Sequence, residues 1–213
     1  VQAFTKVPLD VKKYNLDLVS ITAHKIHGPK GIGALYIRKD LQRKMVKLMD
    51  GGGHEFGKRA GTENVPGAVG FAKAVEIAKE KHIKHMKELR DYIINNILDE
   101  IPDSRLNGPD IKTKGDKRLC NNVNIAMKYI EGESILLKLS DEGIAVSTGS
   151  ACSSKKLEPS HVLKAIGLSN MDANSSIRLS ISRFTTKEEI DKTVKVLQKI
   201  IEKLRKISPF KLS

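Results

Sequence analysis

The first half of the chain begins with short β-rich runs and then becomes helical. Aliphatic and β-branched residues are dense at residues 16–22 and 33–38, which predicts two strands. The loop between them contains Gly28-Pro29-Lys30-Gly31 and is long for a tight hairpin. From residue 65 to about residue 101 apolar residues recur at helical spacing, and Pro102 ends the segment. This segment is therefore predicted to be one long helix or two helices in succession.

The second half of the chain mixes predicted strands and helices. Strands are expected at residues 122–127, 145–148 and 177–182, and a helix is expected to start near Glu131. The run Thr185-Thr186-Lys187-Glu188 has the form of a capping box. Apolar residues recur at helical spacing after it, at Ile190, Val194, Leu197, Ile201 and Leu204. The last helix is therefore predicted to be amphipathic and to pack on a sheet.

The composition fits a folded protein with a basic surface. With 39% hydrophobic and 30% charged residues, 213 residues can bury one sizeable core or two modest ones. The formal net charge of +13 raises the question of nucleic-acid binding. The charge is mostly lysine spread along helical segments, and no aromatic residues interleave with a basic run. We therefore expect a solvated basic surface and no nucleic-acid partner.

The two cysteines and the absence of long apolar runs bear on the compartment. Cys120 and Cys152 lie in different surroundings, which argues against a disulfide framework and favours a reducing compartment. No stretch approaches the roughly 20 apolar residues of a membrane span, so no membrane association is expected. The chain starts without Met in what reads as the middle of a folded unit, so we expect its natural N-terminus to be missing. The predicted location is the cytoplasm, or the mitochondrial matrix in a eukaryote.

Two local patterns can carry chemistry. Lys25 follows a β run, with the hydroxyl of Thr22 and the imidazole of His24 within three residues. A lysine amine can bind an aldehyde cofactor as a Schiff base, and hydroxyl and imidazole groups suit its phosphate, although a solvated turn lysine has the same local pattern. Cys152 lies among small residues and glycine, which suits an accessible nucleophile but leaves a structural cysteine open. Cys120, beside an apolar residue and a strand, is predicted to be a packing residue.

Six motifs follow one another along the chain. They are Thr22-Ala23-His24-Lys25 with Gly28-Pro29-Lys30-Gly31-Ile32-Gly33, Gly51-Gly52-Gly53-His54-Glu55, Arg59-Ala60-Gly61-Thr62-Glu63-Asn64-Val65-Pro66, Glu131-Gly132-Glu133-Ser134, Gly149-Ser150-Ala151-Cys152-Ser153 and Ser175-Ser176-Ile177-Arg178. In order and spacing they resemble the NifS/IscS class of cysteine desulfurases over essentially the whole chain. The long loop that carries Gly149-Ser150-Ala151-Cys152 resembles the class I branch.

The resemblance implies the α/β fold of type I transferases that depend on pyridoxal 5′-phosphate (PLP), the aspartate aminotransferase-like fold. Residues 1–70 would be the C-terminal part of the large cofactor-binding domain, and residues 71–213 the small α+β domain. The family's acidic partner of the pyridinium nitrogen and its ring-stacking histidine would precede Gln2. Without the acidic residue, the chain alone is expected to bind the cofactor weakly or not to turn over.

The resemblance also implies roles in cofactor binding. Lys25 would bind PLP covalently, Thr22 and His24 would contact its phosphate, and Gln2 would contact its phenolic oxygen. Thr62 would reach the cofactor phosphate of the neighbouring subunit, which implies a homodimer. No metal site is implied.

The implied reaction converts L-cysteine to L-alanine and leaves the sulfur on Cys152 as a persulfide. Arg178 would clamp the substrate carboxylate with its planar two-pronged donor, although a surface strand arginine is the alternative. The sulfur would go to acceptor and scaffold proteins of iron–sulfur cluster assembly and to thio-cofactor synthesis. Because a glycine-bearing loop must serve both cofactor and acceptor, residues 147–154 are expected to be mobile. Rival interpretations are an aminotransferase or selenocysteine lyase of the same fold, and an inactive scaffold that only binds acceptor proteins.

Overall fold

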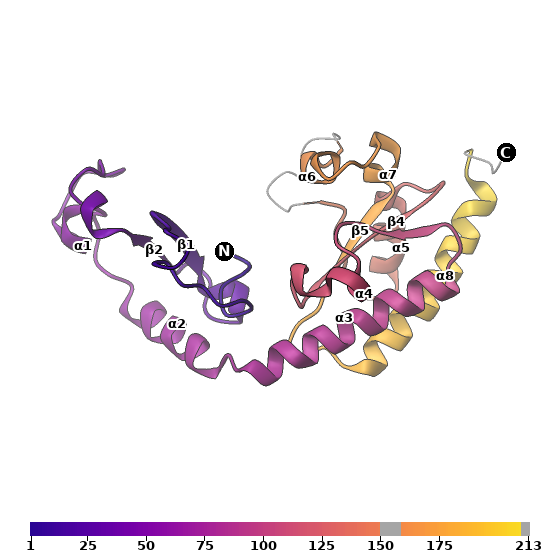
Figure 1. The fold of residues 1–213 in the computed structure, drawn as a ribbon, viewed down its shortest axis with the longest axis horizontal. Coiled ribbons are helices and arrows are strands. Elements are labelled where there is room, and N and C mark those ends of the chain that lie inside the picture. Colours follow the sequence, from indigo (N-terminus) through magenta and orange to yellow (C-terminus); the bar gives the residue numbers. More distant parts are fainter. Residues whose placement is uncertain (150–158, 210–213) are drawn as a thin grey trace. The chain divides into compact units, whose positions relative to one another are not determined.

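In a computed structural model, residues 1–149 and 159–209 are described, and they form two compact units (Figure 1). The first unit spans Val1–Glu80 and the second spans Lys81–Ser213. The domain boundary predicted after residue 70 falls inside helix α2, Val65–Ile77. Phe71 and Ala74 of this helix belong to the small core of the first unit, together with Ala23 and Ile26 of its loop region.

Two antiparallel strands form the sheet of the first unit. β1 spans Leu18–Thr22 and pairs with β2, Gly33–Ile37, so both strands predicted in this region are confirmed. The connection between them contains a short 3₁₀ helix, η1, at Ala23–Ile26. The remaining short elements are η2 at Lys39–Leu41 and α1 at His54–Gly57.

The long apolar-periodic segment forms two helices. α2 begins after Asn64, whose side chain accepts a hydrogen bond from the backbone N–H of Gly67 and so caps the helix. The helix ends at Ile77, Ala78 after it is extended with ψ at 108°, and α3 follows at Glu80–Glu100. The second of the two sequence-based alternatives is therefore confirmed.

The second unit contains a three-stranded antiparallel sheet in the order β3-β4-β5. β4 spans Asn122–Met127, as predicted. β5 spans Ser176–Ser180, so it begins one residue before the predicted strand at 177–182 and ends two residues before that strand's predicted end. β3, Ser104–Leu106, was not predicted, because three residues are too few to show an alternating pattern. The strand predicted at residues 145–148 is wrong: only Ser147 forms a bridge there, to Arg178.

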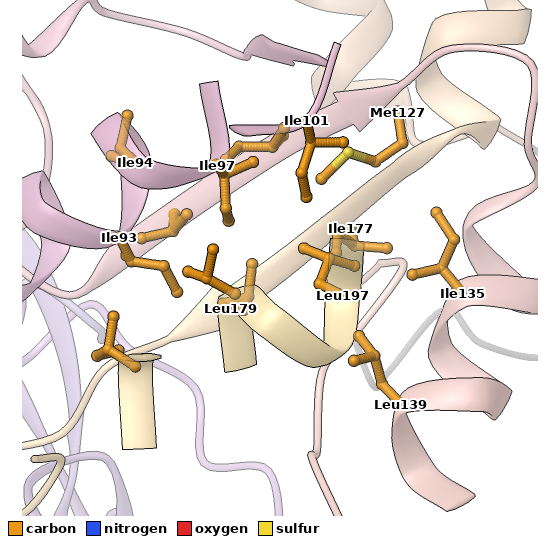
Figure 2. Close-up of a cluster of buried hydrophobic side chains, with 14 of the residues drawn as sticks. Ile93, Ile94, Ile97, Ile101, Met127, Ile135, Leu139, Ile177, Leu179 and Leu197 are labelled. Atoms are coloured by element: carbon orange, nitrogen blue, oxygen red, sulfur yellow. The ribbon is translucent and has the colours of Figure 1, made fainter. Parts of the chain in front are cut away.

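One face of this sheet carries the main core (Figure 2). Its apolar side chains pack against α3, against α5 at Gly132–Asp141 and against α8 at Lys187–Ile207. Side chains that are almost fully buried in this cluster include Ile93, Ile97, Ile125, Ile135, Leu139, Ile177 and Leu197. Burial of each such side chain contributes on the order of 2 kcal/mol, so this cluster dominates the stability of the unit. Cys120 is 6% exposed within the cluster, which confirms its predicted packing role.

The amphipathic final helix is also confirmed, but its cap is shifted by one residue. Thr186 is the N-cap, and its hydroxyl and the Glu189 carboxylate exchange hydrogen bonds with each other's backbone N–H groups. The predicted pair of Thr185 and Glu188 is therefore wrong. Thr185 makes other contacts: its carbonyl accepts from His85 Nε2 and its hydroxyl accepts from the Ser182 N–H.

The remaining short helices lie around the sheet of the second unit (Figure 1). They are α4 at Ile111–Lys114, η3 at Gly115–Lys117, α6 at His161–Ala165 and α7 at Asn170–Asn174. Within residues 1–149 and 159–209, no helix combines the length and apolar character needed to cross a membrane.

Candidate active site

In the turn that carries Lys25, some side chains pack into the core and the others are exposed. η1 repeats every three residues, so Ala23 and Ile26 point to the same side. These two residues are 0% and 3% exposed and belong to the core of the first unit. His24 and Lys25 lie between them in sequence and are exposed. The packing therefore fixes the backbone and presents the imidazole and the amine outside the core.

Close packing against α2 explains why this turn is followed by Gly28-Pro29. A Cβ atom at Gly28 would lie 2.9 Å from Ala23 Cβ and 3.0 Å from Ala74 Cβ. A Cβ atom at Gly70 would lie 2.6 Å from Pro29 Cγ. Contacts under 3.0 Å are too short for side-chain carbon atoms, so both positions need glycine. The Lys25 turn is therefore held rigidly against a helix with small residues on its facing side.

Thr22, His24 and Lys25 are brought together at the end of β1. Thr22 Oγ1 lies 3.0 Å from His24 Nδ1 and donates to the Ile32 carbonyl at 3.2 Å. The Lys25 carbonyl accepts from Lys6 Nζ at 3.3 Å, whereas its side chain is exposed. The Thr22 hydroxyl and the His24 imidazole are thus in contact, and Lys25 is the next residue of the same short turn.

Gln2 and Thr62 lie in the same unit, and neither forms a hydrogen bond to this cluster among the described residues. Gln2 is half-buried, and its Oε1 atom is buried without a hydrogen-bond partner in the described part of the chain. Thr62 is exposed in the segment between α1 and α2, where another molecule can reach it.

Arg178 lies in the second unit, on the face of the sheet opposite the apolar core. Its neighbours Ile177 and Leu179 are buried in that core, so the alternation of the strand directs Arg178 to the other face. Arg178 is half-buried, and its guanidinium has no hydrogen-bond or ion-pair partner among residues 1–149 and 159–209. Five donors without an acceptor suit a carboxylate ligand.

Cys152 lies outside the described residues, so the structure does not place it. Residues 147–149 are the described part of the segment expected to be mobile. Ser147 is bridged to Arg178, with Arg178 N donating to Ser147 O at 2.6 Å and Ser147 N donating to Arg178 O at 3.0 Å. The Ser147 hydroxyl accepts from the Gly149 N–H at 3.3 Å. The segment that leads to Cys152 is therefore joined to the strand of the candidate clamp.

A polar cluster near Arg178 was not foreseen from the sequence. Asn107 and Asn124 lie on the same face as Arg178, and the Asn107 carbonyl accepts from the buried Arg118, whose own carbonyl accepts from the buried Arg90. Burial lowers the pKa of Arg118, and the positive charge of Arg90 lowers it further. Arginine is rarely buried, so the sequence carried no signal for this cluster.

The comparisons with known proteins agree on one family. The model of the aminotransferase class-V family matches residues 1–193. The chain is 51% identical to the cysteine desulfurase IscS of Dictyoglomus turgidum over 99% of its length and 52% of the relative. It is 49% identical to that of Methanosarcina thermophila over 98% of its length and 50% of the relative. The chain thus spans about half the length of the curated relatives it matches.

Solved structures show the same relationship. A NifS-like protein superposes with a TM-score of 0.80 and 35% identity, over 96% of this chain and 51% of that one. SspA in complex with cysteine superposes with a TM-score of 0.64 and 33% identity, over 87% of this chain and 49% of that one.

Proposed function

The chain belongs to the aminotransferase class-V family, and on that premise we propose that it is part of a PLP-dependent cysteine desulfurase that converts L-cysteine to L-alanine. The family match confirms the predicted α/β fold of type I PLP-dependent transferases. The observation that carries the proposal is 51% identity to a cysteine desulfurase over 99% of this chain. The exposed Lys25 and the Arg178 guanidinium, which has no partner among residues 1–149 and 159–209, support it, because they are the groups that the reaction requires.

The residues of the first unit fit the cofactor. Lys25 would hold PLP covalently through its exposed amine, and Thr22 and His24 would bind the phosphate with their adjacent hydroxyl and imidazole. Gln2 would donate to the phenolic oxygen through its amide N–H. When bound, PLP supplies an electron sink that weakens the bonds at the substrate α-carbon.

The remaining steps belong to the protein's own side chains. Arg178 would hold the substrate carboxylate, and a solved relative, SspA, was obtained in complex with cysteine. The Lys25 amine would move protons to and from the substrate carbon. The Cys152 thiolate would bond to the substrate sulfur while the C–S bond breaks and its electron pair stays with the carbon. Protonation of that carbon then gives alanine, and the sulfur remains on Cys152 as a persulfide.

The partners of this enzyme are part of the proposal. The exposed position of Thr62 is compatible with a contact to the cofactor phosphate of a second subunit, in a homodimer. Sulfur-acceptor and scaffold proteins of iron–sulfur cluster assembly would receive the persulfide sulfur. We place this activity in the cytoplasm, or in the mitochondrial matrix if the source is eukaryotic.

Turnover of L-cysteine by the native protein tests the function. With a thiol reductant present, we expect alanine and sulfide to appear in equal amounts. Borohydride reduction followed by peptide mapping should place the pyridoxyl group on Lys25, with Lys30 of the adjacent loop as the internal control. Turnover without alanine, or a label on Lys30, would overturn the proposal.

A further inference from the structure

A row of polar residues crosses the sheet of the second unit beside Arg178. Asn124 of β4 is the direct partner of Arg178 in β5, and Ser147 forms the bridge on the other side of Arg178. Asn107 follows the end of β3 and continues the register, since its N–H donates to the Asn124 carbonyl at 2.9 Å. Directly opposed residues in antiparallel strands point to the same face. These four residues therefore form one row on the face opposite the core.

The Asn107 side chain fixes the orientation of Asn124. Asn107 Nδ2 donates to Asn124 Oδ1 at 2.7 Å and to Ser176 Oγ at 2.9 Å. Asn107 is only 3% exposed, and its backbone carbonyl accepts a hydrogen bond from the Arg118 guanidinium. Ser176 in turn donates to the Asp172 carbonyl at 2.6 Å. Asn107 Nδ2 and Ser176 Oγ each donate to a defined acceptor, and the contact with Asn107 Nδ2 holds the oxygen of the Asn124 amide toward Asn107; Asn107 Oδ1 is buried without a hydrogen-bond partner among the described residues.

This orientation controls what Arg178 can bind. Asn107 engages the oxygen of the Asn124 amide, so the amide nitrogen is the end of Asn124 that has no hydrogen bond among the described residues, beside its cross-strand neighbour Arg178. That nitrogen has only donors, and a guanidinium has only donors, so the two cannot pair. The neighbouring residue therefore provides no internal acceptor that would compete with a ligand carboxylate for Arg178.

We propose that Asn107 and Asn124 are positioning residues that keep the Arg178 guanidinium available for the substrate carboxylate, an inference that rests on the proposed function. Asn107 fixes the orientation of the Asn124 amide, and Asn124 places its amide nitrogen beside Arg178. Neither residue touches the reacting atoms. Both act through Arg178, so their replacement should change substrate binding and leave the chemical step intact.

The variant Asn124→Asp tests this directly. It has nearly the same shape and keeps the oxygen that accepts from Asn107, but it adds a carboxylate oxygen beside Arg178. An internal ion pair must then be broken before substrate binds, so KM for L-cysteine should rise at least about 10-fold with kcat within about 2-fold. Ser180→Ala is the matched control, because Ser180 lies on the same strand and face as Arg178, is exposed, and pairs with Asn122 instead of Asn124. Its KM should stay within about 2-fold of the native value.

Two inhibitors separate positioning from a general structural effect. Asn124→Asp should raise the inhibition constant of 3-mercaptopropionate, which carries a carboxylate, and leave that of cysteamine, which has none, unchanged. Equal changes for both inhibitors, or an unchanged KM while Arg178→Lys raises KM, would refute the positioning role and leave the proposed function intact. Absence of cysteine turnover in the native protein would refute both.

Discussion

Replacement of Gly132 by alanine tests how tightly α5 is seated on the sheet. Gly132 is buried at the first position of α5. A Cβ atom there would lie 2.7 Å from the Ser176 carbonyl oxygen, 3.0 Å from the Asn174 carbonyl oxygen and 3.2 Å from Thr148 Cγ2. Two of these three atoms belong to the backbone, at the start of β5 and the end of α7, so they cannot move without shifting those elements.

The magnitude follows from this geometry. Overpacking in a well-packed region typically costs about 1–3 kcal/mol. The higher helix propensity of alanine offsets up to about 1 kcal/mol, and less at the first turn of a helix. We expect Gly132→Ala to lower the free energy of unfolding of the second unit by about 1–2 kcal/mol, which is a factor of about 5–30 in its folded-to-unfolded ratio.

Hydrogen exchange of the β4 and β5 amides, measured by mass spectrometry, reports on this unit alone. Gly115→Ala is the matched control, since φ at Gly115 is −64° and the nearest atom to its Cβ position is Arg90 NH2 at an ordinary 3.6 Å. That variant should be neutral or slightly more stable. Equal exchange rates in the two variants would show that α5 is not seated as tightly as these distances indicate.

Three further variants test other features. Arg178→Lys should raise KM for L-cysteine by about 10-fold or more while cofactor absorbance is retained, because a point charge cannot replace a two-pronged clamp; an unchanged KM would remove Arg178 from the site. Cys152→Ala should abolish sulfide release and Cys120→Ala should not, with alkylation after brief exposure to cysteine locating the extra sulfur; a persulfide on Cys120 would contradict the mechanism. Thr186→Ala should destabilise the second unit by about 1 kcal/mol in urea unfolding, because it removes the capping box; a stability loss below about 0.3 kcal/mol would contradict a role for this cap.

The capping box shows where local sequence stops being decisive. Two consecutive threonines and two consecutive glutamates satisfy the same spacing twice, once from Thr185 and once from Thr186. The contacts of Thr185 with His85 and Ser182 settle the choice, and His85 is 100 residues away in sequence. A one-residue shift of this kind depends on tertiary contacts that a local pattern does not contain.

Whether a predicted strand formed depended on its backbone pairing as well as on its residues. β4 was predicted at its observed bounds because its alternating residues fill the core on one face. Residues 145–148 have similar composition, but only Ser147 exchanges backbone hydrogen bonds with a strand. The Lys25 turn was recognisable from its side chains, whereas the buried Asn107 was not, because its importance depends on neighbours 17 and 69 residues away.

The three-residue repeat of η1 has a consequence for how the site can diversify. Ala23 and Ile26 are committed to packing, while His24 and Lys25 are exposed to whatever the turn binds. In a saturation mutagenesis scan, substitutions of Ala23 and Ile26 should therefore reduce the yield of folded protein, and substitutions of His24 and Lys25 should reduce activity without reducing that yield. Because the two requirements fall on different positions, substitutions that alter ligand preference can accumulate at this turn without eroding the fold that supports it.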